Sequence, residues 1–184
     1  MARVSFDSTK KPLEELLKQA HVGIIQLPDF QRSWVWKDDG LRALLASVSR
    51  SFPVGTLMTL QTGGEVNFKH RLIEGAPGEY RSAKPDFLLL DGQQRITSLY
   101  QLTFRQDVIH TRDVRKHAIE RWYYINMNQA LDPSVDREAA IVGVRKDKTE
   151  LRGFEIVQDL STPEFEYENC MFPANKVFHL TSGR

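Results

Sequence analysis

Cysteine is almost absent from this 184-residue sequence, in which Cys170 is the only one. A single thiol cannot form an internal disulfide, so we expect the fold to depend on its hydrophobic core and the chain to be intracellular. No apolar run approaches the roughly 20 residues that a membrane-spanning helix needs. The first residues, MARVSFDSTKKPLEELL, also lack the apolar centre and small-residue cleavage site of a signal peptide. These absences predict a cytoplasmic protein with no membrane segment.

Charge of either sign is not in excess, because 25 lysines and arginines stand against 24 aspartates and glutamates. The net charge of +1 gives the whole chain no electrostatic preference for nucleic acid, so any such preference has to come from a local patch. The glycine-rich string GxxxxGK[ST] of Walker-type nucleotide sites occurs nowhere in the sequence.

Metal-ligating motifs are missing as well. The five histidines are scattered, and none has the spacing of a ligand set: His21, His70, His110, His117 and His179. No nuclease motif can be recognised among them. Cleavage of DNA by this chain alone is therefore not expected.

The residues that are present describe an ordinary globular protein, with 41% hydrophobic and 27% charged residues. The length suits one domain over residues 1–184, and the abrupt end at VFHLTSGR leads us to expect a fragment of a longer protein. Apolar periodicity predicts helices over 10–20, after a cap at Asp38 or Asp39, and after residue 95. Strands are expected over 24–26, 55–62, 66–75, 87–90, 121–127, 139–144 and 154–157, with 55–62 and 66–75 paired as a hairpin. This mixed order predicts an α+β fold.

The most unusual stretch is FLLLDGQQRITSLYQLTF, Phe87 to Phe104, where an apolar strand runs into five polar or small residues and then a helix. Helix initiation explains part of it. Asp91 suits the N-cap, Gly92 eases the turn, and Gln94 stands where a capping-box partner belongs. Gln93 and Arg95 are not needed for capping, although exposure to solvent would account for both.

The same five residues also suit a phosphate site. A helix N-terminus offers unpaired backbone N–H groups and a partial positive charge, and Arg95 can add a guanidinium contact to the same anion. Asp91, at the carboxyl end of the strand, is placed to hold a divalent cation. Gln93 or Gln94 can orient an attacking water, as glutamine does in several phosphate-cleaving enzymes.

A second polar and aromatic cluster, LPDFQRSWVW, places Gln31 and Arg32 between Phe30 and two tryptophans. In one interpretation the rings pack on the core while Gln31 and Arg32 face water. In the other, Arg32 contacts a phosphate while an aromatic ring stacks on a base. Ser47, near the end of the following helix, is a weaker candidate for the same surface.

A basic segment, RQDVIHTRDVRKHAIER from Arg105 to Arg121, is the best candidate for a DNA-contacting face. Contacts to several phosphates would make binding fall steeply with salt. Asp107, Asp113 and Glu120 interrupt the segment, a pattern that is typical of an ordinary solvated surface.

Three blocks together make the sequence similar to a known family. PDFQRSWVW, FPVGTLMTL and LLLDGQQRITSLYQL occur in that order over residues 28–102. In this the chain resembles the N-terminal domain of GmrSD-type proteins, which are type IV restriction enzymes that act on modified DNA, together with related phage-defence proteins. Ser33 and Gly40 depart from the family pattern, and neither change removes a presumed functional group.

The resemblance implies a ParB/sulfiredoxin-like fold and nucleoside triphosphate hydrolysis with Mg²⁺ or a similar cation at Asp91. It also implies a separate His-Asn-His nuclease domain or subunit that this domain gates, and contact with DNA is compatible with it. Catalysis is assigned to Asp91, Gln93, Gln94 and Arg95, and nucleotide binding to Gln31, Arg32, Ser47, Gly92 and Arg95.

Three hypotheses follow from these observations. The chain is a nucleoside triphosphatase, or a module that binds nucleotide or DNA without turnover, or a scaffold in which DGQQR only starts a helix. The sequence favours the first hypothesis. The main claim of this hypothesis is that a polyphosphate binds at the amino end of the helix after Leu90 and is held by the guanidinium groups of Arg32 and Arg95.

Overall fold

The strand that carries the DGQQR motif lies inside a four-stranded sheet. The structure is a computed structural model that describes residues 7–64, 68–152 and 155–179. The order of the first sheet is β2 (Met58–Gln61), β4 (Phe87–Asp91), β1 (Ile25–Pro28) and β3 (His70–Arg71). The central strands β1 and β4 run parallel, and the two edge strands are antiparallel to them.

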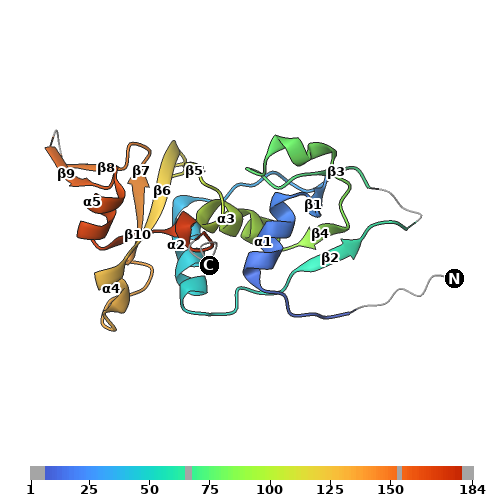
Figure 1. The fold of residues 1–184 in the computed structure, drawn as a ribbon, viewed down its shortest axis with the longest axis horizontal. Helices are drawn as coiled ribbons and strands as arrows, with labels where there is room; N and C mark the ends of the chain where they lie inside the picture. The colour runs from blue at the N-terminus through green and yellow to red at the C-terminus, as the bar shows by residue number, and fades with distance from the viewer. Residues whose placement is uncertain (1–6, 65–67, 153–154, 180–184) are drawn as a thin grey trace.

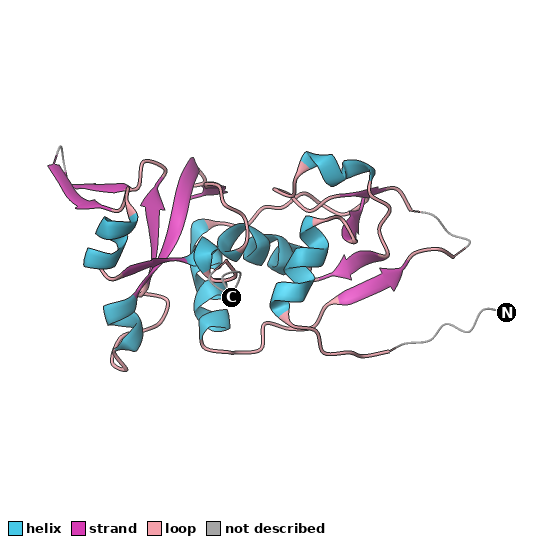
Figure 2. Ribbon diagram, in the orientation of Figure 1, coloured by secondary structure: helices cyan, strands magenta, loops and turns pink. Residues whose placement is uncertain are grey.

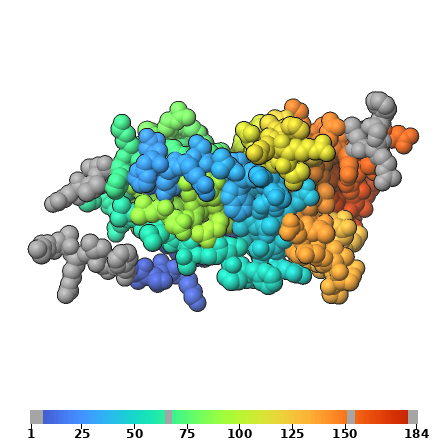
Figure 3. Space-filling view, turned by 180° about the vertical axis from the view of Figure 1, so that it is seen from behind, coloured from blue at the N-terminus to red at the C-terminus, as the bar shows by residue number. Residues whose placement is uncertain are grey.

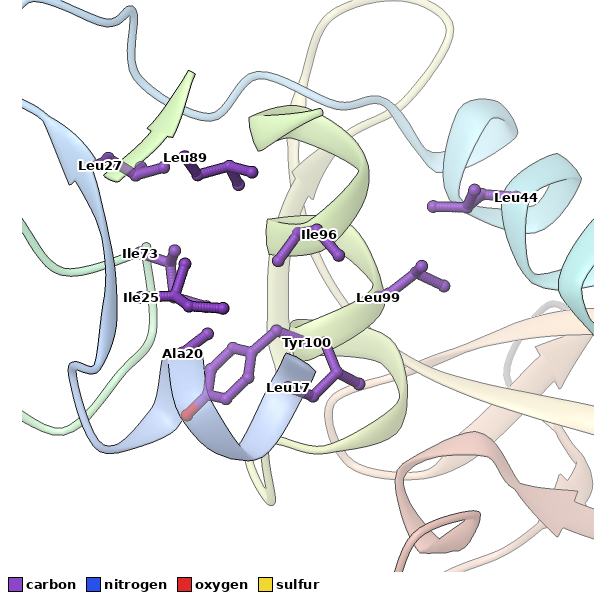
Figure 4. Close-up of a cluster of buried hydrophobic side chains, with 10 residues drawn as sticks. All are labelled: Leu17, Ala20, Ile25, Leu27, Leu44, Ile73, Leu89, Ile96, Leu99 and Tyr100. Carbon is purple, nitrogen blue, oxygen red and sulfur yellow. The ribbon is translucent and has the colours of Figure 1, made fainter. Parts of the chain in front are cut away.

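Helices α1 (Leu13–His21) and α3 (Gln93–Thr103) cover one face of this sheet. Between them lies a core cluster, drawn in Figure 4, of Leu17, Ala20, Ile25, Leu27, Leu44, Ile73, Leu89, Ile96, Leu99 and Tyr100. The apolar residues of β1 and β4 that face this cluster alternate with residues of the opposite face, as the pleat of a strand requires. This packing fixes the direction in which α3 leaves the end of β4.

A second sheet is built around the long strand β6 (Ala118–Asn126). β10 (Met171–Pro173) and β5 (Ile109–Arg112) pair along it in the order β10-β6-β5, and β7 (Ile141–Arg145) also pairs with it. The smaller elements are α4 (Met127–Leu131), α5 (Pro163–Glu168), η1 (Gly78–Ser82), η2 (Ala174–Lys176) and the two-stranded pair β8 (Thr149–Arg152) and β9 (Glu155–Asp159).

Helix α2 (Asp38–Ser49) connects the two halves of the molecule. Its Leu44 belongs to the first core cluster, whereas Leu41 and Leu45 belong to the second. α3 divides its side chains in the same way, with Leu99 in the first cluster and Leu102 in the second. In Figures 1 and 2 these helices lie between the two groups of strands. Seen from behind in Figure 3, the early segments, in blue and green, fill one end of an elongated body and the orange segments fill the other.

The structure confirms the α+β class and most of the expected elements, from the first helix to β9. Phe154 of the last predicted strand and residues 66–67 of the predicted strand 66–75 lie outside the described residues, and among residues 68–75 only β3 (His70–Arg71) forms a strand. The expected hairpin is wrong, because β2 pairs with β4 and β3 pairs with β1. The Gly-Gly pair after residue 62 predicts that the chain bends there, but it does not determine which strand β2 pairs with. β2 pairs with β4 instead, whose Leu88 and Leu89 are buried.

Two predicted helix caps are also wrong. The N-cap of α2 is Lys37, and neither Asp38 nor Asp39 caps it, since both lie in the first turn. The N-cap of α3 is Gly92 with no side-chain cap, and Asp91 belongs to β4. None of the helices that the structure describes is long and apolar enough to cross a membrane.

Candidate functional site

The junction between β4 and α3 is a sharp turn at Gly92. This residue has a φ of +88°, a left-handed conformation that glycine adopts without the cost of a Cβ. A Cβ at this position would also lie 2.3 Å from Cδ2 of Leu57. Close packing by the segment before β2 therefore requires glycine here, independently of any ligand.

Arg95 joins this turn to the same segment. Its guanidinium group donates to the backbone oxygen of Val54, to that of Thr56 at 2.8 Å and to Asp91 Oδ2 at 3.3 Å. Gly55 lies between the two carbonyls, and a Cβ there would stand 1.9 Å from Nη1 of Arg95. The block FPVGT is thus folded around the arginine of the DGQQR motif.

Gln93 and Gln94 bind the first motif block on another side of α3. The Gln93 amide donates to the backbone oxygen of Arg32 at 2.6 Å. The Gln94 amide donates to the oxygen of Ser33 at 3.2 Å and accepts from the N–H of Val35 at 3.1 Å. These contacts bring together blocks that are about sixty residues apart in the sequence.

Gln31 reaches back to the end of β4. Its amide nitrogen donates to the oxygens of Leu89 and Leu90 at 2.8 and 2.9 Å. Its amide oxygen is buried and has no hydrogen-bond partner among the described residues. A buried acceptor without a partner is costly, and a ligand or water that donates to it would remove that cost.

Arg71 and Glu74 complete the support of the first block, and no sequence pattern marks either residue. Arg71 donates to the backbone oxygens of Gln31 and Arg32 at 3.3 and 3.1 Å and pairs with Glu74 at 3.0 Å. Glu74 also accepts from the N–H of Trp34 at 2.9 Å. An ion pair between sheet and loop therefore fixes the backbone that carries Arg32.

The aromatic residues of the first block have different roles. Trp34 and Trp36 pack against the second core cluster, and the indole N–H of Trp34 donates to Ser98 Oγ at 2.9 Å. Phe30 is 70% exposed and meets Phe68 edge to face, with ring centroids 5.8 Å apart. The packing interpretation holds for the tryptophans, and Phe30 is the ring that remains open to a partner.

Several groups at the start of α3 are not bound by the described residues. The backbone N–H groups of Gln93, Gln94 and Arg95 donate to no acceptor in this part of the chain. The Asp91 side chain is 69% exposed, and Arg95 occupies only one of its oxygens. The exposed guanidinium group of Arg32 has no partner within the described ranges.

Arg32 and Arg95 have different partners in this structure. Arg95 bonds to the segment before β2, whereas the backbone of Arg32 is held by Gln93 and Arg71. Ser47 lies on α2, where its hydroxyl donates to the oxygen of Ala43 in its own helix. The Arg95 side chain uses three of its five N–H groups in its bonds to Val54, Thr56 and Asp91.

The side chains at the junction between β4 and α3 can supply only some of the ligands that a metal ion needs. Within the described ranges, no group of three or more His, Cys, Asp and Glu side chains could bind one. At this junction Asp91 offers an exposed carboxylate. Mg²⁺ is commonly held by one or two carboxylates together with phosphate oxygens and water, so the site fits Mg²⁺ that arrives with a phosphorylated ligand.

Comparison with known families accounts for the three blocks. The model of the GmrSD restriction endonuclease N-terminal domain matches residues 13–179. The chain belongs to this family. The match runs well beyond the motif blocks of residues 28–102 and takes in the second sheet.

One relative is much longer than this chain. The "Uncharacterized protein MJ0686" of Methanocaldococcus jannaschii is 29% identical over 141 residues, which are 74% of this chain. The chain spans only 23% of the length of that relative. A GmrSD N-terminal domain is thus similar to one part of a much larger protein.

Proposed function

We propose that this GmrSD N-terminal domain binds a nucleoside triphosphate with Mg²⁺ at the amino end of α3 and hydrolyses it. The unpaired N–H groups of the first turn beside the exposed carboxylate of Asp91 carry this proposal. Such N–H groups, together with the helix dipole, attract phosphate oxygens, and the carboxylate attracts the accompanying cation. When bound, Mg²⁺ would neutralise charge that develops on the transferred phosphoryl group.

The other motif residues would position these groups. Arg95 orients Asp91 and holds the segment of residues 54–56, while Gln93 and Gln94 hold the backbone around Arg32. Arg32 then supplies the free cation for a terminal phosphate. Gln31, with its unpaired buried oxygen, is the group that can accept a hydrogen bond from a ligand hydroxyl or a water.

The activity of the longer protein is part of the proposal. Restriction of modified foreign DNA requires a nuclease, which we place in a separate His-Asn-His domain or subunit that this domain gates. The family to which the chain belongs supports this arrangement. Defence against phage would be its biological outcome.

Phosphate release tests the enzymatic proposal. The rate is measured with Mg²⁺ for the wild type, for Asp91→Ala and for Arg95→Ala, with Asp107→Ala as an exposed, arginine-paired control. We expect Asp91→Ala to lower the rate by about a hundredfold, because a positioned charge in a catalytic site commonly contributes that much. Equal rates in all four proteins would remove the DGQQR assignment.

A second candidate is a module that binds nucleotide or DNA without turnover. It is favoured because the side-chain nitrogens of Gln93, Gln94 and Arg95 each donate to backbone oxygens, a structural role that does not depend on turnover. Saturable binding by calorimetry with no product over hours would select this candidate over the first.

A further inference from the structure

A pocket of about 330 Å³ lies in the second sheet, at the end of α3 opposite to the DGQQR motif. β6 forms its floor, while α5, the end of β10 and the residues after α3 form its walls. Its volume falls in the range of small-ligand sites, which is about 300 to 1,000 Å³. The pocket takes no part in the function proposed above.

An indole ring and a tyrosine line the floor of this pocket. Trp122 and Tyr124 are two residues apart on β6, so both side chains lie on the same face of the sheet. The indole N–H of Trp122 donates to the backbone oxygen of Lys146 at 3.0 Å, which fixes the ring. Lys148 Nζ lies over the ring, 5.5 Å from its centroid, and the ring also packs against the buried cluster that contains Tyr124.

A carboxylate is fixed beside the ring with one oxygen left open. Glu166 Oε1 accepts from the hydroxyl of Tyr124 at 2.7 Å and from Lys148 Nζ at 3.1 Å. The other oxygen of Glu166 accepts nothing from the described residues. Burial, with the neighbouring carboxylate, raises the pKa of Tyr124, so its hydroxyl stays protonated and remains a donor to Glu166.

The opposite wall supplies an amide and a second cation. The side chain of Asn175 makes no hydrogen bond to the described part of the chain, although it lines the pocket. Lys176 is exposed and donates to Gln106 Oε1 at 3.1 Å. Because Glu166 neutralises Lys148, Lys176 gives the pocket an excess of positive charge.

We propose that this pocket binds one nucleotide unit, with its base against Trp122 and its phosphate at Lys176. An indole face is a stacking platform for any base, and a lysine at the mouth of the pocket suits a phosphate. The amide of Asn175 can both donate and accept a hydrogen bond, and the open oxygen of Glu166 can accept one. The polar edge of a base carries donors and acceptors that these groups can bind. The ligand is either a free mononucleotide or a nucleotide within single-stranded DNA.

Two probes distinguish a free mononucleotide from a nucleotide within single-stranded DNA. Each of the four deoxynucleoside monophosphates is titrated into the 184-residue chain by calorimetry, and a fluorescein-labelled twelve-nucleotide single strand is titrated by anisotropy. Saturable binding of a monophosphate identifies the free ligand. Binding of the strand alone identifies the polymer, and either result supports the proposal if it depends on the pocket residues.

Variants decide whether the pocket is responsible. Trp122→Leu is expected to weaken binding about tenfold, because stacking on an aromatic ring contributes on that order. Asn175→Ala and Lys176→Ala, at the surface of the pocket, are expected to weaken it about threefold while leaving thermal unfolding unchanged. Tyr167→Leu, at an 85% exposed ring outside the pocket, and Lys18→Ala, at an exposed and paired lysine, are the matched controls.

Asp91→Ala separates this pocket from the site at the other end of α3. The proposal predicts a second binding event that persists in Asp91→Ala and is about tenfold weaker in Trp122→Leu. It is overturned if neither probe binds at millimolar concentration. It is also overturned if binding survives in Trp122→Leu, Asn175→Ala and Lys176→Ala, whether or not Asp91→Ala removes it.

Discussion

At the residue scale, the motif side chains bind mainly to backbone groups. Arg95, Gln93 and Gln94 each bond to carbonyl oxygens of segments that lie far away in the sequence. The sequence could predict that these residues are polar and gather at the start of a helix. It could not predict their partners, because every residue type carries the same carbonyl and no pattern marks the ones that accept.

Glycine at the turn gives the first test at this scale. Gly92→Ala is expected to destabilise the fold by about 1 to 2 kcal/mol through its left-handed backbone and by about 1 to 3 kcal/mol more through the contact with Leu57. Gly63→Ala isolates the first cost, because Gly63 has a φ of +97° and nothing within 4 Å of its Cβ position. Urea unfolding measures both, and equal losses would contradict the close approach of Leu57.

His21 gives a second test through pH. Burial lowers the pKa of this histidine, whose Nδ1 lies 2.7 Å from the Tyr100 hydroxyl, and the Glu79 carboxylate only partly opposes the shift. The unfolded chain then binds the proton more readily than the folded one. Its contribution to stability is complete above about pH 6.5 and is lost as the pH falls towards the lowered pKa. We expect wild type to lose more stability than His21→Gln between pH 7 and pH 5 in thermal unfolding, and parallel curves would refute this.

At the element scale, the start of α3 is held from two sides. The segment of residues 32–35 bonds to Gln93 and Gln94, and the segment of residues 54–56 bonds to Arg95. The apolar pattern was enough to predict α3 and β4. The failed hairpin shows the limit of that method, since an edge strand such as β3 pairs with whichever neighbour buries its residues, however distant.

Removal of the Arg95 side chain should detach the segment of residues 54–56 from the start of α3. Arg95→Ala is expected to lower the free energy of unfolding by about 2 kcal/mol, because hydrogen bonds from a charged group are lost. Arg95→Lys should recover only part of this, since an ammonium group cannot span the carbonyls of Val54 and Thr56 together. Hydrogen exchange of residues 54–57 reports the loosening.

Arg50→Ala is the matched control for this variant. Arg50 is exposed and lies over the nearby Phe52 ring, with 5.8 Å from its guanidinium carbon to the centroid, but it bonds to neither carbonyl. Exchange as slow in Arg95→Ala as in Arg50→Ala would show that the arginine does not hold the segment.

At the scale of the whole molecule, α2 and α3 make the two sheets one unit. Each helix contributes side chains to both of the first two core clusters. The sequence motifs end within α3 and predict only the first sheet and its helices. The second sheet lacks motif residues, and the apolar pattern predicted β6 and β7 but missed the short strands β5 and β10.

This shared helical layer predicts a single cooperative unfolding transition. Leu99→Ala, at a fully packed position of the first cluster, is expected to cost about 2 to 5 kcal/mol. It should shift the unfolding of both sheets equally, as measured by amide exchange resolved along the chain. Early exchange of the first sheet, with the second still protected, would show instead that the halves unfold separately.

Binding at the amino end of α3 is the claim on which the proposed function depends, and calorimetry tests it most directly. A non-hydrolysable nucleoside triphosphate is titrated with Mg²⁺ into wild type, Asp91→Asn and the control Asp107→Asn. We predict saturable binding by wild type and by the control, and affinity at least about tenfold weaker in Asp91→Asn, since a charge that contacts the metal is lost. No binding by wild type, or one affinity shared by all three proteins, would contradict the account.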